Sequence, residues 1–277
     1  MSYENTTITI DSAQLDEMSK SILCELAKNG FEIKPFKIGW YNDKVDKSFQ
    51  LTEAYDTVGF LIISTPAMFE KAFIPFICRQ ECTGVKDPLD QCVAQYFQQI
   101  KKNFPEYNIE AIHDFELHPN RRPKILVQTA AHVSGAAFFY QRADVHPDPW
   151  DPQKKICGVC IHPLFGGWFA LRGVLIFKNL QCPSLVQENP KDVIPNNEQR
   201  IELLEKFNFS WQDWTYRDVF KAIEKYSDDQ KQYFATPPKE RMDLIMWLKD
   251  KNKNQDVQNI DNKEDKNCTS TMNMETN

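Results

Sequence analysis

Two cysteines and a histidine lie close together in the stretch ICGVCIHPLFGGWFALRG. Cys157, Cys160 and His162 are the soft donors that zinc binds, but a structural zinc site needs four ligands, and a second pair would have to come from Cys78 and Cys82. Apolar, strand-like sequence flanks the motif, whereas a redox dithiol belongs at a helix N-terminus that lowers the thiol pKa. We therefore favour buried or half-buried thiols on a strand over a metal or redox site.

The cations in and around this stretch could bind an anion. Arg172 carries the only formal charge in the run, so its guanidinium must reach solvent, form a pair, or meet an anionic ligand. Arg217 and Arg241 lie among aromatic residues, with acidic neighbours that could be purely structural partners. The sequence HPNRRPK, residues 118–124, gathers three more cations that suit carboxylates or phosphates, although such clusters are often solvated turns.

Two further motifs have both a structural and a functional interpretation. Gly166 and Gly167 are typical of a hairpin turn, and the alternative is the close approach of a flat ligand to bare backbone. His132 in AAHVSG is, taken alone, more often a core histidine than a ligand. The spacing of the residues alone does not show whether either motif has a functional role.

The elements that must position these residues can be predicted from periodicity. Apolar residues at helical spacing predict a helix from residue 12 to just before Gly30, and a second helix over 87–104 with Asp87 as its N-cap. A shorter helix is expected to open at Pro66. Runs of β-branched and aromatic residues predict strands over 31–42, 57–65, 108–117, 123–133, 155–163 and 167–177, and helical character returns over 198–250. This mixture predicts an α+β fold.

The chain has 277 residues, 42% of them hydrophobic, so it can bury a sizeable core. We predict three parts: a flexible lead over 1–10, one domain over 11–250, and a disordered polar tail over 251–277. Its formal net charge is −6, which argues against nucleic acid or a broad anionic membrane patch as a partner. Apolar runs are too short for a membrane span.

Eight cysteines are too sparse for a disulfide scaffold in a chain of this length. The N-terminal MSYENTTITID lacks the basic and apolar regions of a secretory signal. We therefore expect a cytoplasmic protein with free thiols.

Four segments of the sequence carry a resemblance: HPNRRPKILVQTAAHVSGAAFFYQRADV, GVCIHPLFGGWFALRGV, FNFSWQDWTYRD and YFATPPKER. Taken together they resemble the cobalamin C (MMACHC) family of cytosolic vitamin B12 processing proteins. The resemblance implies a flavin-nitroreductase-like fold, in which helices flank a mixed sheet, and it implies cobalamin bound with its lower base detached from cobalt. It also implies two activities: reductive decyanation of cyanocobalamin with reduced flavin (FAD or FMN), and glutathione-dependent dealkylation of alkylcobalamins.

The resemblance also implies which residues of this sequence form the site. The glutathione-binding arginines would be Arg172, Arg217 and Arg241, which agrees with their positions among apolar and aromatic residues. No protein side chain is assigned as catalytic, because the glutathione thiolate would be the nucleophile, and none is assigned as a metal ligand. The cobalamin-binding residues would be Asp114, Ile125, Leu126, Val127, Gln128, Phe139, Tyr140, Gln141, Cys160 and Leu171.

The partners implied by the resemblance are the cobalamin D adaptor protein and methionine synthase with its reductase, and homodimerisation is left open. Two alternatives also stay open at this point. One is a cobalamin chaperone that binds and hands over its ligand without turnover, and the other is a flavin reductase of the same fold that acts on another substrate.

Overall fold

The computed structural model describes residues 6–79 and 87–253. The chain divides into two compact units, Met1–Met68 with Val93–Tyr226, and Phe69–Cys92 with Ser227–Asn277. The region 11–250, which the sequence suggests to be one domain, therefore contributes to both. No helix among the described residues is long and apolar enough to cross a membrane.

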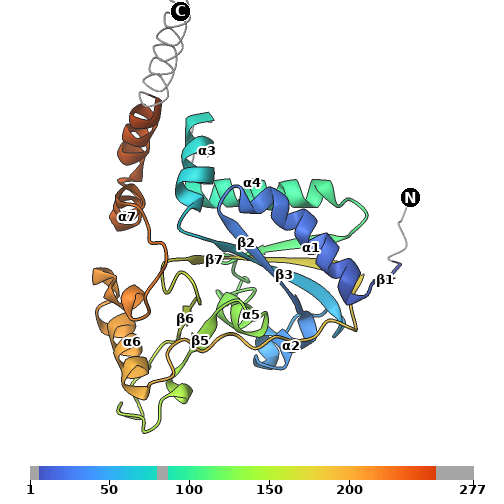
Figure 1. The fold of residues 1–277 in the computed structure, drawn as a ribbon, viewed down its shortest axis with the longest axis horizontal. Helices are drawn as coiled ribbons and strands as arrows, with labels where there is room; N and C mark the ends of the chain where they lie inside the picture. The colour runs from blue at the N-terminus through green and yellow to red at the C-terminus, as the bar shows by residue number, and fades with distance from the viewer. Residues whose placement is uncertain (1–5, 80–86, 254–277) are drawn as a thin grey trace, which may run out of the picture. The chain divides into compact units, whose positions relative to one another are not determined.

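The first unit is built on a mixed five-stranded sheet, drawn near the centre of Figure 1. Its strands are β1 (Ile8–Thr9), β2 (Phe31–Lys37), β3 (Thr57–Ser64), β4 (Ile109–His113) and β7 (Ala170–Gln181). β1 runs parallel to β7, while β3 and β4 pair antiparallel to β7, and β2 pairs antiparallel to β3. The predicted α+β fold with a mixed sheet flanked by helices is thus confirmed. Residues Ile8 and Thr9 belong to the segment 1–10 that we expected to be flexible, but they pair with β7 as strand β1.

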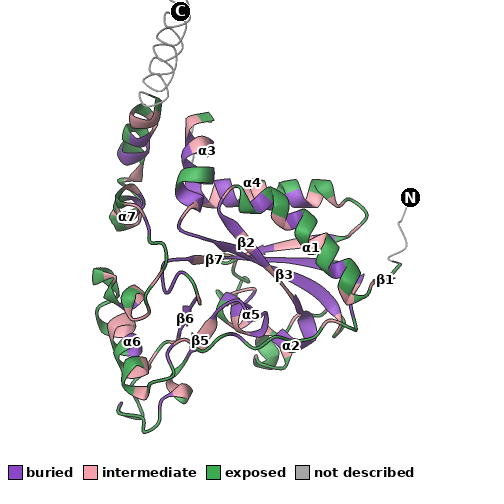
Figure 2. Ribbon diagram, viewed as in Figure 1, coloured by how far each residue is buried: buried purple, intermediate pink, exposed green. Residues whose placement is uncertain are grey.

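Helices cover both faces of this sheet (Figure 1). The helices α1 (Ser12–Ala27) and α4 (Pro88–Asn103) lie on one face, and α2 (Ile38–Asn42) and α5 (Val127–Val133) lie on the other. Asp11 forms a capping box with Gln14 at the start of α1, and Gly30 follows the helix at a φ of 77°. Every residue of β3 is buried, as expected for a strand covered on both faces (Figure 2).

Two segments that the sequence pattern assigns to strands are helical. Residues Ile38–Asn42 continue from β2 as α2, and Val127–Val133 form α5 instead of a strand. In α5, Ala130 and Ala131 are fully buried, so the helix packs closely through small side chains against the sheet. The β-branched residues at both ends of α5 suggested a strand, but tertiary packing overrides this local propensity.

The rest of the first unit contains a separate two-stranded sheet of β5 (Phe138–Tyr140) and β6 (Val159–Ile161), the helix α6 (Asn197–Phe209), and the short 3-10 helices η3 (Arg142–Asp144), η4 (Trp211–Asp213) and η5 (Thr215–Asp218). Another 3-10 helix, η1 (Lys47–Phe49), follows α2. A second apolar core joins β5, β6 and α6.

The second unit is helical. Its elements are the π-helix η2 (Phe69–Phe73), α3 (Ile74–Arg79), α7 (Asp228–Ala235) and a helix over 241–253. The rings of Phe69 and Phe73 both pack against Tyr233, at centroid distances of 5.6 and 5.0 Å. The first three residues of the predicted polar tail belong to the last helix, and the remainder of that tail lies outside the described residues.

Candidate functional site

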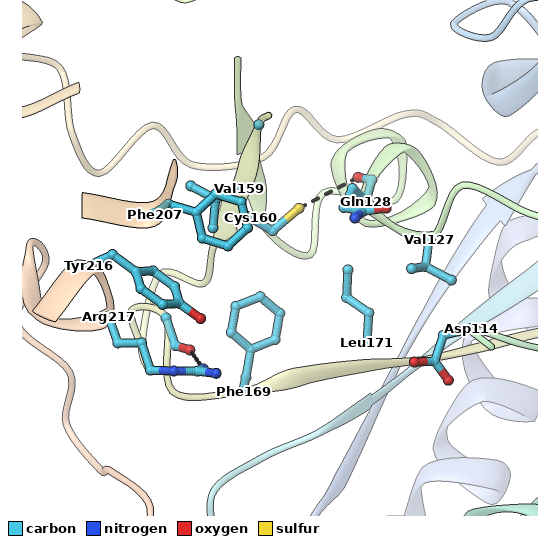
Figure 3. A pocket seen from close by; sticks show the side chains of 12 residues that line it. Asp114, Val127, Gln128, Val159, Cys160, Phe169, Leu171, Phe207, Tyr216 and Arg217 are labelled. Carbon is cyan, nitrogen blue, oxygen red and sulfur yellow. Dashed lines mark hydrogen bonds between the residues drawn. The ribbon is translucent and has the colours of Figure 1, made fainter. Parts of the chain in front are cut away.

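The first unit contains a cavity of about 240 Å³ where β6, α5, α6, η5 and the start of β7 meet (Figure 3). Its lining combines aromatic and aliphatic side chains with a few polar groups, as ligand sites usually do. The lining residues are Asp114, Val127, Gln128, Gly158, Val159, Cys160, Gly167, Phe169, Leu171, Phe207, Tyr216 and Arg217.

One wall of the cavity comes from β6 and the residue before it. Cys160 lies opposite Phe139 in the antiparallel register, is buried, and directs its Sγ to the carbonyl oxygen of Gln128 at 3.7 Å. Burial raises the pKa of the Cys160 thiol well above its usual value, so this sulfur stays protonated near neutral pH. The structure therefore presents Cys160 as a neutral lining residue, whereas Cys157 is exposed.

The tight turn after β6 explains the two consecutive glycines. His162 and Gly166 exchange two backbone hydrogen bonds, and Gly166 has a φ of 58°. A Cβ on Gly167 would lie 2.7 Å from Cα of Arg217. The glycine pair thus forms a turn, and the backbone that approaches it closely belongs to the segment of Arg217.

The close contact between Gly167 and the Arg217 backbone fixes Arg217 at the edge of the cavity. Its Nη1 donates to the carbonyl oxygen of Gly167, and the Gly167 N–H donates to the Arg217 carbonyl oxygen at 3.1 Å. Its guanidinium carbon also lies 5.0 to 5.6 Å from the centroids of four aromatic rings, those of Trp168, Trp214, Tyr216 and Tyr226. Such an aromatic enclosure stabilises a cation and restricts its side chain.

A carboxylate marks another side of the cavity. Asp114 follows the last residue of β4, and its backbone N–H donates to the carbonyl oxygen of Arg172 at 3.3 Å. Although Asp114 is exposed as a residue, partial desolvation raises the pKa of its carboxyl group against the opposing effect of the Arg172 charge. The cavity therefore holds an acidic group and a cationic group at different positions (Figure 3).

Arg172 itself does not line this cavity. It is the extra residue of a β-bulge in β7, where Ile63 pairs with Leu171 and Ile62 pairs with Gly173. Its Nε donates to Ser64 Oγ at 2.8 Å, and its Nη2 is buried with no hydrogen-bond partner among the described residues. A buried guanidinium with an unsatisfied donor is a candidate anion-binding group.

Arg241 belongs to the second unit. Its Nη1 pairs with Asp87, its Nε donates to the Thr236 carbonyl oxygen, and its guanidinium lies 4.8 Å from the centroid of the Tyr233 ring. Asp87 also accepts hydrogen bonds from Tyr233 and from the first turn of α4, which confirms its predicted capping role. The joint action of the three arginines on glutathione stays a prediction.

Half of the expected cobalamin-binding residues line the cavity, namely Asp114, Val127, Gln128, Cys160 and Leu171. The other five expected residues are not among those that line the cavity. Ile125 is a core residue, Leu126 donates its backbone N–H to the Tyr41 hydroxyl, and Phe139 packs on the same core. Tyr140 is fully buried with its hydroxyl bonded to Asp192, and Gln141 is exposed at the start of η3.

Five lining residues were not singled out from the sequence: Gly158, Val159, Phe169, Phe207 and Tyr216. Phe207 and Tyr216 lie in or beside the aromatic-rich segment FNFSWQDWTYRD, so aromatic density around Arg217 was the available signal. The others come from β6 and from the residues just before β6 and β7, where packing between segments distant in sequence decides which side chains face the cavity.

The part of the chain with described coordinates holds no group of three or more His, Cys, Asp or Glu residues that could bind a metal ion. Cys82, half of the second cysteine pair considered above, lies outside the described residues. His132 accepts a hydrogen bond at Nδ1 from the Phe139 backbone N–H at 3.2 Å and is not a lining residue. This contact supports a structural role for His132.

Comparison with known proteins adds an independent finding. The profile of the Methylmalonic aciduria and homocystinuria type C family (MMACHC) matches residues 30–245. A Homo sapiens protein named cyanocobalamin reductase / alkylcobalamin dealkylase is 49% identical over 233 residues, which cover 84% of this chain and 81% of the relative. A Bos taurus protein of the same name is also 49% identical, over 85% of this chain and 83% of the relative.

The fold is shared as well. A crystal structure of the C. elegans B12-trafficking protein CblC, described as a human MMACHC homologue, superimposes with a TM-score of 0.76 at 32% sequence identity. The match covers 86% of this chain and 97% of that protein. The chain therefore belongs to the Methylmalonic aciduria and homocystinuria type C family.

Proposed function

We propose that this protein is a cobalamin-processing enzyme with the two activities for which its relatives are named, cyanocobalamin reduction and alkylcobalamin dealkylation. The observation that carries the proposal is the identity of about half of all residues with enzymes of that name over more than four fifths of both chains. The cavity beside the sheet supports it, because half of the expected corrin-contacting residues meet there.

The size of the cavity bears on how cobalamin would bind. At about 240 Å³ it is smaller than the range typical for small-molecule sites, and a corrin is larger than most such ligands. Cobalamin would therefore lie across the mouth of the cavity, with only part of its ring system inside. Phe169 and Leu171 would pack against the flat macrocycle, while Asp114 and Gln128 offer polar contacts to its amide substituents.

We propose that dealkylation is a nucleophilic substitution. The glutathione thiol loses its proton, its sulfur forms a bond to the alkyl carbon, and the cobalt–carbon bond breaks with both electrons remaining on cobalt. Arg217 would hold the anionic co-substrate in line for this attack, and the family resemblance implies a glutathione-binding role for Arg172 and Arg241 as well. Cys160 is not suited to the role of nucleophile, since burial keeps its thiol protonated.

Decyanation needs electrons in place of a nucleophile. A reduced flavin, FAD or FMN, would supply them when bound, because flavins have accessible one-electron states. The aromatic and aliphatic walls of the cavity suit a flat ring. The protein's own residues would contribute by holding cobalamin with its lower base detached and by limiting water around the cobalt.

The same binding mode would let the protein act as a chaperone after processing. The product would pass to methionine synthase and its reductase, or to the cobalamin D adaptor protein. We propose a cytoplasmic location for these steps, since the thiols would need a reducing compartment.

A spectroscopic titration tests the proposal most directly. Cyanocobalamin and methylcobalamin are titrated with purified protein while the visible spectrum is followed, and glutathione is added afterwards. A shift to a base-off spectrum followed by glutathione-dependent loss of methylcobalamin is the expected result. A shift without conversion would favour the non-catalytic chaperone, and the absence of any shift would contradict the cobalamin assignment and favour the flavin reductase.

A further inference from the structure

The hydroxyl group of Tyr216 is a polar group of the cavity that the proposed function does not use. The residue is only 8% exposed and yet lines the cavity, where its hydroxyl points inward beside Arg217 (Figure 3). The hydroxyl makes no hydrogen bond to any other residue that the structure describes. Buried polar groups normally have partners, so a hydroxyl left open toward a cavity points to a ligand.

The ring of Tyr216 is held rigidly. It meets the ring of Phe207 edge-on at 5.1 Å, with 70° between the two planes. Asp213 accepts hydrogen bonds from both the backbone and the hydroxyl of Thr215, and Trp214 adopts a left-handed φ of 65° between the two short helices. The Tyr216 hydroxyl therefore has a fixed position before any ligand arrives, which lowers the entropic cost of using it.

Arg217 offers a second donor at the same corner. Its Nη1 is bound to Gly167, while its Nη2 makes no hydrogen bond within the described ranges and the residue lines the cavity. The guanidinium lies over the Tyr216 ring at 5.0 Å. Burial raises the pKa of Tyr216, so its hydroxyl remains a neutral donor at the pH where the Arg217 charge attracts an anion.

We infer that Tyr216 and Arg217 form one anion-binding corner of the cavity, in which the Tyr216 hydroxyl donates to a carboxylate of the thiol co-substrate. The inference rests on the proposed glutathione-dependent activity. A carboxylate has two acceptor oxygens and so suits two neighbouring donors, whereas a thiolate has one acceptor atom. Tyr216 thus binds the co-substrate, while cobalamin is held by other walls.

The test is the Tyr216→Phe variant, which removes one oxygen atom and keeps the ring. Dealkylation of methylcobalamin is measured as a function of glutathione concentration, together with the Kd for methylcobalamin. A hydrogen bond to an ionised group predicts a rise of about tenfold or more in KM for glutathione. The Kd for cobalamin and the rate of flavin-dependent decyanation should stay within about twofold of wild type, the scale of effects at sites without a specific role. Tyr55→Phe, which removes a surface hydroxyl bonded to Asp43, is the matched control.

A second co-substrate identifies the group that is bound. With glutathione diethyl ester, in which both carboxylates are masked, kcat/KM should be the same for wild type and Tyr216→Phe. An unchanged KM for glutathione in the variant would overturn the inference, and so would a parallel loss of cobalamin binding and decyanation, since that would indicate a structural role. Failure of the wild-type protein to dealkylate would instead contradict the proposed function itself.

Discussion

The Nε of Arg172 donates a hydrogen bond to Oγ of Ser64 at 2.8 Å across the β3–β7 pair, in a region where both residues are buried. This bond satisfies one donor of a guanidinium whose Nη2 has no partner in the described part of the chain. The bulge in β7 places the side chain there, because it gives β7 one more residue than the facing strand.

Replacing Arg172 should separate the two proposed activities. Arg172→Gln removes the charge but can still bond Ser64, so we expect glutathione-dependent dealkylation to fall by about tenfold or more while decyanation falls much less. Steady-state rates with methylcobalamin measure dealkylation, and those with cyanocobalamin measure decyanation. Equal loss of both activities would instead indicate a defect in folding or in cobalamin binding.

Cys160 should be dispensable as a nucleophile. Its thiol is buried and its raised pKa keeps it protonated, so Cys160→Ser should retain dealkylation within about threefold at saturating glutathione. The serine hydroxyl can reach toward the same Gln128 carbonyl oxygen that the sulfur contacts. If dealkylation disappeared while cobalamin still bound, the assignment of glutathione as the nucleophile would be wrong.

The stability of the folded protein should depend on the protonation of His132. Burial lowers the pKa of His132 below its usual 6.5, so the unfolded chain binds the proton more tightly than the folded protein does. Stability attributable to the neutral ring is present above pH 6.5 and is lost as the pH falls below it. Chemical denaturation between pH 7.5 and about 5 should show a smaller loss for His132→Gln than for wild type.

A control separates this effect from general acid denaturation. His118→Gln removes an exposed histidine in the HPNRRPK segment, and its pH profile should match that of wild type. A profile of His132→Gln that also matched wild type would show that protonation of His132 does not destabilise the folded protein.

The glycine pair can be tested by adding one carbon. In Gly167→Ala the new Cβ would meet Cα of Arg217 at 2.7 Å, so the backbone on one side has to move. Overpacking of this kind costs about 1–3 kcal/mol of unfolding free energy. Urea denaturation should show this loss, and KM for glutathione should rise because Arg217 is displaced. Unchanged values of both would mean that the two segments do not approach so closely in solution.

Much of the fold could be predicted from local sequence. The capping residues Asp11 and Asp87, the positive φ of Gly30 and the continuous apolar run of β3 each depend on residues near in sequence. Local physical chemistry is sufficient there, because caps and helical periodicity act within one or two turns. The segments 38–42 and 127–133 were misassigned since their apolar residues suit either element, and only packing against the sheet selects the helix.

The sequence by itself determined the α+β class and the family resemblance, and it singled out seven of the twelve residues that line the cavity. Only the tertiary structure decided which cations face that cavity, because Arg172 lies in a bulge of β7 and Arg217 lies beside Gly167. Likewise the exposure of the Tyr216 hydroxyl to the cavity follows from contacts with Phe207 and Arg217 in the folded protein. Orientation is a property of packing between distant segments, and no local pattern encodes it.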